Sequence, residues 1–139
     1  MDVKITVIGV QEMDGQTDTT EMTTVGTLSE DVGGYVLRYA ESAATGFNDT
    51  VTTLRIQPQI VTMERTGAHA GLLVLEHKKR HLCSYATPIG NVMLGVYTET
   101  VETQLTQTGG TVNVSYTLDI GGNMMSRQKL TVRVDRKEK

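Results

Sequence analysis

The chain has few aromatic residues, cysteines and prolines. Its 139 residues include no Trp, one Phe, one Cys and two Pro. With one thiol, Cys83, no internal disulfide is available, so packing alone must hold the fold, and we expect a reducing, cytoplasmic location. No apolar run is long enough for an export signal or a membrane span, so neither is expected.

The net charge argues against a nucleic-acid-binding protein. The net charge is −3 and the pI is about 5.6, which removes the electrostatic attraction that nucleic-acid binders have for phosphate. No phosphate-binding glycine loop, nucleophile elbow or zinc-binding motif occurs, so we expect no nucleic acid, no cofactor and no metal.

What the sequence does have is threonine, a strand former, at 22 positions. Apolar and polar residues alternate along most of the chain, and glycine or polar breaks recur about every 8 to 14 residues, as in antiparallel meanders. We therefore predict an all-β chain with one domain over residues 1–139. The expected strands are 3–11, 17–28, 34–42, 50–57, 60–66, 70–77, 82–87, 91–105, 111–120 and 129–134.

These strands can form a sandwich or a closed wall. Closure removes exposed edges, and strands as long as 91–105 suit a tilted barrel better than a sandwich. An antiparallel up-and-down β-barrel of 8–10 strands is the favoured fold. Turns are expected at 13–16 and 31–34, where Asp14-Gly15 and Gly33-Gly34 tolerate positive φ, and also at Gly109-Gly110 and Gly121-Gly122.

Three strands carry polar residues on otherwise apolar rows. Glu41 ends the row of Tyr35, Leu37 and Tyr39, and Arg65 follows Val61 and Met63. Thr87 follows Cys83 and Tyr85 in a third strand. If every connection is a hairpin, these three strands run the same way, and Glu41, Arg65 and Thr87 meet at one mouth of the barrel.

Three interpretations of this mouth stay open. Glu41 and Arg65 are expected to form an ion pair that closes the barrel end, or Arg65 binds the anionic group of a ligand, or the site is catalytic. Tyr39 and Tyr85 offer hydroxyl groups, although Tyr39 is expected to pack its ring into the core. Cys83 is expected to be a small packed hydrophobe.

Residues 77–81, His-Lys-Lys-Arg-His, form the one concentrated basic stretch. Its position between two strands is typical of a solvated hairpin tip. Strand direction puts His81 at the opposite end from Glu41, which argues against an enzyme that would use both.

Several blocks of the sequence together resemble the YwiB-like family, which consists of uncharacterised small bacterial proteins. They are Tyr39-Ala40-Glu41-Ser42, Arg65-Thr66-Gly67 and, most specifically, the stretch from His81 to Gly90. The resemblance runs over nearly the whole chain and implies a calycin-like barrel in a bacterial cytoplasm. It implies no activity.

The predicted function is binding of a small amphipathic or anionic ligand at the barrel mouth. The candidate ligand-binding residues are Glu41, Arg65, Tyr85, Thr87, Tyr39 and His81. The alternative is an interaction or homodimerisation module with a packed barrel and no ligand, and an enzyme of unknown reaction is third. Apolar residues on the inner rows, such as Leu54, Val96 and Val114, suffice to fill the interior.

Overall fold

A computed structural model describes residues 1–42, 49–68, 70–87 and 90–136, and these form ten antiparallel strands without a helix. The side chains of residues 85–87 are outside this description. The all-β prediction is confirmed, and all ten predicted strands are present. They are β1 (Asp2–Met13), β2 (Gln16–Asp31), β3 (Gly34–Ala40), β4 (Thr50–Gln57), β5 (Ile60–Gly67), β6 (Gly71–Glu76), β7 (Arg80–Thr87), β8 (Gly90–Thr106), β9 (Gly109–Ile120) and β10 (Asn123–Arg136).

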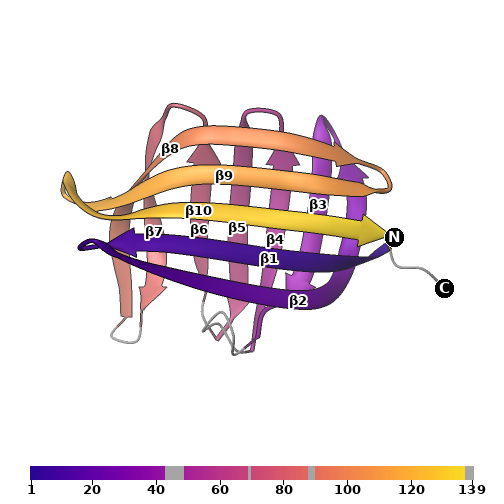
Figure 1. The fold of residues 1–139 in the computed structure, drawn as a ribbon, viewed down its shortest axis with the longest axis horizontal. Coiled ribbons are helices and arrows are strands. Elements are labelled where there is room, and N and C mark those ends of the chain that lie inside the picture. Colours follow the sequence, from indigo (N-terminus) through magenta and orange to yellow (C-terminus); the bar gives the residue numbers. More distant parts are fainter. Residues whose placement is uncertain (43–48, 69, 88–89, 137–139) are drawn as a thin grey trace.

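The strands form one sheet that folds over into two layers. β3 to β7 lie behind β1, β9, β10 and most of β2 and β8, and the strands of the two layers run crosswise (Figure 1). The sheet order is β6-β5-β4-β3-β2-β1-β10-β9-β8-β7, so every neighbouring pair except β1 and β10 is also consecutive in the chain. This is the predicted up-and-down barrel.

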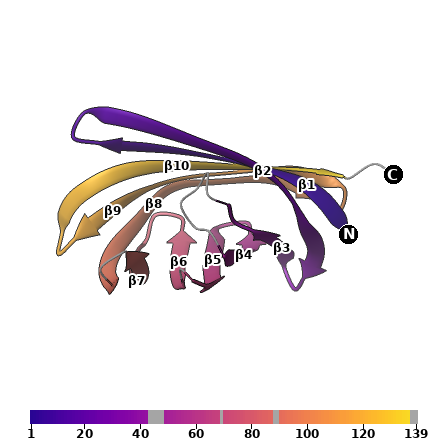
Figure 2. The same cartoon turned by 90° about the horizontal axis from the view of Figure 1, so that it is seen from below.

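Two strands turn the corners between the layers, as orthogonal packing requires. β2 pairs with β1 through Thr27 and with β3 only from Gly26 onward. β8 pairs with β7 up to Tyr97 and with β9 from Gly95 onward. Because each belongs to both layers, β2 and β8 are the longest strands, with 16 and 17 residues. Figure 2 shows β2 bending from one layer into the other.

A bulge changes the orientation of β8 partway along its length. The register with β9 shifts between Thr98 and Thr100. Before the shift, Val96 and Thr98 are buried, and after it the odd-numbered Val101 and Thr103 are the less exposed positions. The extra residue, Glu99, keeps one face of a very long strand on the core.

The barrel is nearly closed, with a seam between β6 and β7. No β-ladder joins these strands among the described residues, and the Val74 N–H donates to Cys83 Sγ across the seam at 3.4 Å. At one end the connection after β6 pairs with β8 instead, where the Lys78 N–H donates to the Thr98 carbonyl at 2.7 Å. Cys83 is buried, which confirms its prediction as a packed hydrophobe.

A single hydrophobic cluster joins the inner faces of the two layers. Leu37, Leu54 and Ile56 come from the back layer, and Ile5 and Val132 come from the front layer. All five are at most 1% exposed. The middle of the barrel is therefore a packed core.

The predicted turns at residues 13–16, 31–34 and 121–123 are present. The prediction of a turn at Gly109-Gly110 is wrong, because the turn lies at Gln107-Thr108 and both glycines begin β9. Their φ angles are 127° and 145°, and a Cβ on Gly110 would collide with the Gln104 carbonyl. Close backbone approach explains these glycines.

Among the described residues, none belongs to a helix of the length and apolar character that a membrane crossing requires.

Candidate functional site

A polar row crosses three strands of the back layer near one end of the barrel. The register pairs Tyr39 of β3 with Thr52 of β4, and Thr52 with Arg65 of β5. Facing residues in neighbouring strands point to the same side of a sheet. Tyr39 and Thr52 are 3% and 0% exposed, so this side is the interior. The alternation that places mostly apolar groups in the interior places polar ones here.

Glu41 brings a carboxylate into this row from just beyond the end of β3. Its backbone N–H donates to the Thr50 carbonyl at 2.8 Å, which continues the pairing of β3 with β4. The Thr52 hydroxyl donates to Glu41 Oε1 at 2.7 Å. Arg65 Nε lies 4.0 Å from the same oxygen. We call Tyr39, Glu41, Thr52 and Arg65 the mouth cluster.

The two charged members of the mouth cluster differ in their access to water. The Glu41 side chain is 2% exposed, and the Arg65 side chain is 15% exposed. Solvent and dissolved molecules therefore reach the guanidinium more easily than the carboxylate. A contact of 4.0 Å is too long for a hydrogen bond, so the attraction between these two atoms is Coulombic.

The Tyr39 hydroxyl is held in its neutral form. Burial raises the pKa of Tyr39 well above its ordinary value, and the nearby Glu41 carboxylate, to which it is hydrogen-bonded, raises it further. Arg65 partly offsets this rise. Tyr39 therefore acts as a hydrogen-bond donor and not as a base. Its ring lies in the core, as expected.

The structure brings together three of the six predicted site residues: Glu41, Arg65 and Tyr39. The backbone of β7 ends at Thr87, on the same side of the barrel as the ends of β3 and β5 (Figure 1). This is the arrangement that the strand directions predicted. The side chains of Tyr85 and Thr87 lie outside the described residues, so their predicted contribution stays a prediction.

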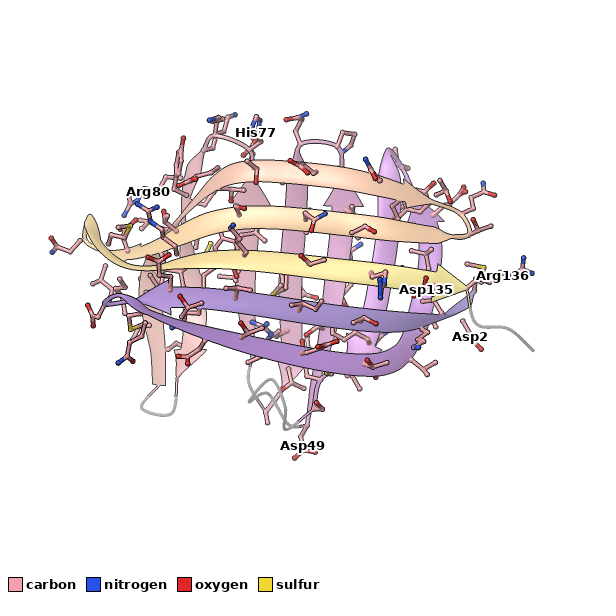
Figure 3. All side chains as sticks on the ribbon, viewed as in Figure 1. Asp2, Asp49, His77, Arg80, Asp135 and Arg136 are labelled. Carbon is pink, nitrogen blue, oxygen red and sulfur yellow. The ribbon has the colours of Figure 1, made fainter. Side chains whose placement is uncertain are left out.

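His81 lies at the other end of the barrel, apart from the mouth cluster. Its Nε2 is 2.8 Å from Glu76 Oε1 at the end of β6. Glu76 pairs with Ile60, the first residue of β5, whereas Arg65 is near the last. Figure 3 marks the two ends, with His77 at the top and Asp49 at the bottom. As the strand directions indicated, His81 does not share a site with Glu41.

The prediction of a hairpin tip at residues 77–81 is wrong, because no ladder joins β6 and β7 among the described residues, and Arg80 and His81 already belong to β7. The basic side chains of this connection are also bonded to acids. Lys79 Nζ is 3.3 Å from Glu76, and Arg80 makes two hydrogen bonds to Asp119 at 2.7 and 3.0 Å. Glu76 and Asp119 were not identified as partners, because a linear pattern does not show which acids lie next to this connection in the folded chain.

Sequence reasoning also missed Thr52 and Thr50. Both are buried, on the same face as Leu54 and Ile56. The signal was present, since these four residues alternate along one strand. The abundance of threonine indicates strands, but an inward-facing threonine also brings a hydroxyl group into the core, where it needs a hydrogen-bond partner.

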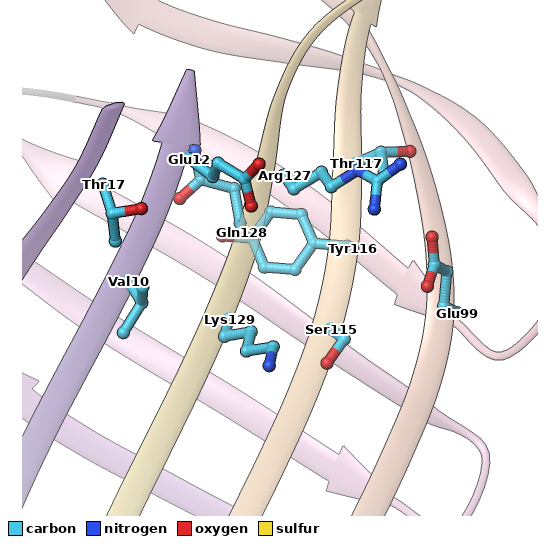
Figure 4. A pocket seen from close by; sticks show the side chains of 10 residues that line it. All are labelled: Val10, Glu12, Thr17, Glu99, Ser115, Tyr116, Thr117, Arg127, Gln128 and Lys129. Carbon is cyan, nitrogen blue, oxygen red and sulfur yellow. The ribbon is translucent and has the colours of Figure 1, made fainter. Parts of the chain in front are cut away.

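The outer face of the front layer carries a separate hollow of about 270 Å³ (Figure 4). Four of its lining residues are charged, Glu12, Glu99, Arg127 and Lys129, and all four are exposed. Acids and bases balance there, so it has no net preference for an anion. No group of three or more His, Cys, Asp or Glu suited to a metal ion occurs within the described ranges.

The comparisons with known proteins agree with this architecture. A domain of unknown function, DUF1934, matches residues 5–132. The chain belongs to the DUF1934 family. The crystal structure of the YwiB protein from Bacillus subtilis superimposes with a TM-score of 0.87 at 18% sequence identity, over 99% of this chain and 92% of that chain. No protein in the curated set matches.

The YwiB-like resemblance that the sequence blocks indicated is therefore confirmed for the family and for the fold. The nearly closed ten-stranded barrel is consistent with the calycin-like shape that the resemblance implied. Neither comparison names a ligand or a reaction for the DUF1934 family.

Proposed function

We propose that this DUF1934 protein binds a small ligand through an anionic group at the mouth cluster. Arg65 is the anion-binding residue, Glu41 positions its guanidinium, and Tyr39 and Thr52 hold Glu41 in place. The supporting observation is the difference in access: the cation of the pair is 15% exposed and the anion is 2% exposed. An anionic group that approaches from solvent meets the arginine first.

The packed core limits what such a ligand is. With Leu37, Leu54 and Met63 at most 2% exposed beneath the cluster, a long apolar tail has no room inside. We therefore propose a small carboxylate or phosphate compound that is bound at the barrel end, in contrast to the deep cavity of barrels that enclose their ligand.

We also propose that the protein acts in a bacterial cytoplasm. The support is its single cysteine, which is buried, and its similarity to a Bacillus subtilis protein. Cell fractionation of the native host with an antibody to the chain tests the location directly.

The binding proposal is tested by NMR titration with acetate, succinate and inorganic phosphate at constant ionic strength. At least one of these anions is expected to shift the Arg65 Nε–H signal in a saturable way. The Arg55 signal is the internal control, because Arg55 is 57% exposed and forms a surface ion pair with Asp31 at 3.6 Å. An Arg65 signal that none of the anions moves, or that moves only in proportion to that of Arg55, would refute the proposal.

Matched variants give a second readout. The anion that binds is expected to raise the thermal unfolding temperature of the wild type. This thermal shift should disappear in Arg65→Gln and should remain in Arg55→Gln, which makes the same charge change. If both variants keep the thermal shift, the anion binds elsewhere and the mouth cluster is only a structural ion pair.

A further inference from the structure

Among the described strands, the part of β2 nearest the β1–β2 turn is paired on one side only. β2 pairs with β1 along its length up to Thr27, but with β3 only over residues 26–31. In the part of the chain that the structure describes, no strand pairs with the other side of residues 16–25. β1, the other strand of the hairpin, is paired with β10 up to Glu12 and Arg127, so only the β2 side of this described hairpin is open. We call residues 16–25 the open edge.

The register shows which backbone groups face outward. Met1 and Leu28 exchange both of their backbone hydrogen bonds, at 2.8 and 3.0 Å. The β1–β2 register continues from this pair without a shift. Because bonded pairs alternate in an antiparallel ladder, the even-numbered residues of β2 bond to β1. The odd-numbered residues direct their N–H and C=O groups to the open side: Thr17, Thr19, Glu21, Thr23 and Val25.

The open edge lacks the features that usually prevent strands from pairing. It contains no proline and no lysine, its register with β1 has no bulge, and residues 16–21 are all exposed. The charged residues that it does carry, Asp18 and Glu21, are both acidic and so repel only an acidic strand. Five of its ten residues are threonine, which suits an added strand. Natural proteins normally interrupt such an edge, since it is a template for pairing with another chain.

The charge around the open edge indicates what pairs with it. Between Lys4 and Arg38 the chain has no lysine, arginine or histidine. The same stretch holds six acidic residues, of which Glu12, Asp14, Asp18 and Glu21 are all exposed on the β1–β2 hairpin. A second copy of this chain would bring a like charge to the interface. A cationic strand would bring the opposite charge.

We propose that the open edge binds an extended cationic segment of a partner protein as an additional β-strand. Backbone hydrogen bonds to the five odd-numbered residues hold the segment, and Glu21, at the centre of the row, pairs with a lysine or arginine opposite it. This interaction surface is separate from the mouth cluster and does not depend on the function proposed there.

The test uses an end-blocked ten-residue peptide of alternating lysine and valine, with the glutamate-valine peptide as its control. Amide hydrogen exchange of the full chain is measured by NMR with each peptide. The cationic peptide is expected to slow exchange at Thr17, Thr19, Glu21, Thr23 and Val25, with no further slowing at Thr20 and Met22. Its affinity should fall as salt rises.

Variants sharpen the test. Glu21→Lys should lower the affinity for the cationic peptide roughly fivefold, as expected when one cross-strand charge pair is lost and its sign is reversed. Glu102→Lys makes the same charge change at an exposed position of β8 and should leave affinity within about twofold. Three results would overturn the proposal: no slowing at the odd-numbered amides, equal binding of the glutamate peptide, or slowing without any peptide in a chain that sediments as a dimer.

Discussion

Two ion pairs in this protein have opposite designs. Arg80 and Asp119 lie on the outer face of the barrel and make two short hydrogen bonds. Glu41 and Arg65 lie inside the barrel end, and the described contact between them is 4.0 Å. The pair with the better geometry is therefore the one on the outer face, where the Arg80 side chain is 44% exposed, although burial makes good geometry more valuable.

The outer pair has an evident structural role. Gly95 of β8 lies between Arg80 of β7 and Asp119 of β9, and a Cβ on Gly95 would collide with both side chains. The missing side chain lets the guanidinium cross one strand and tie β7 to β9. Hydrogen bonds from Arg80 hold the pKa of the Asp119 carboxyl below its ordinary value, and the Gly122 N–H donor adds to this effect.

The inner pair lies on strands that backbone bonds already join, since β3, β4 and β5 are linked by continuous ladders. A buried carboxylate near a partly reachable arginine adds little to a sheet that backbone bonds already hold. The comparison favours a site that recognises something at the barrel mouth, and four changes to the protein test it.

Glu41→Leu is expected to have the largest effect, about 3 kcal/mol of lost unfolding free energy, because it leaves a partly buried guanidinium without its carboxylate. Urea denaturation measures the change. The double variant Glu41→Leu with Arg65→Met should recover most of the loss, since it leaves no uncompensated charge. A double variant as unstable as the single one would mean that the pair braces the barrel after all.

Thr52→Val should cost about 1–2 kcal/mol, because Glu41 loses a buried hydrogen-bond donor. Thr53→Val is the matched control, since Thr53 points to the outer face of the same strand and is only half-buried. The control is expected to stay within about 0.5 kcal/mol of the wild type. Equal losses in the two variants would show that strand propensity, and not the bond to Glu41, is responsible.

In Arg80→Gln, the free energy of unfolding should depend less on pH in the acid range than it does in the wild type. Asp119 has a lowered pKa in the folded protein, so its pair contributes stability above the unfolded pKa, about 4, and loses it as pH falls through the folded value. Urea midpoints between pH 6 and pH 2 measure this loss. Arg55→Gln, at the exposed pair with Asp31, should keep the wild-type slope, and a wild-type slope in Arg80→Gln would contradict the role given to the outer pair.

Tyr39→Phe also removes a hydrogen-bond donor to Glu41 and is expected to cost about 1 kcal/mol of unfolding free energy, at the lower end of the range given for Thr52→Val. Because burial and the Glu41 carboxylate raise the pKa of Tyr39 above its ordinary value, we expect the phenol of the folded protein to stay protonated at pH 11. Ultraviolet titration of the folded protein to pH 11 should therefore show the same tyrosinate absorbance for the variant and the wild type. The stability that neutral Tyr39 contributes is complete below about pH 10 and declines at higher pH, so the variant's stability should depend less on pH there. A smaller absorbance in the variant would show that Tyr39 ionises while folded.

Strand identity followed from alternation, and parity then predicted that Glu41 and Arg65 face inward at the same end. The role of Thr52 was not predicted, because threonine occurs on both faces of a strand. Only the register between strands shows that its hydroxyl contacts a carboxylate. The turn at Gly109-Gly110 was placed wrongly because glycine marks both turns and close strand contacts, and the sequence does not distinguish the two.

The linear pattern by itself determined the all-β class, the number of strands and the side of each strand that is buried, because these depend on a two-residue period within each segment. Tertiary structure decided everything that depends on contacts between distant segments. It placed β2 and β8 in both layers, left the edge of residues 16–25 open and brought Arg80 to Asp119, 39 positions away. Such contacts arise from register and curvature of the whole sheet, which no single segment encodes.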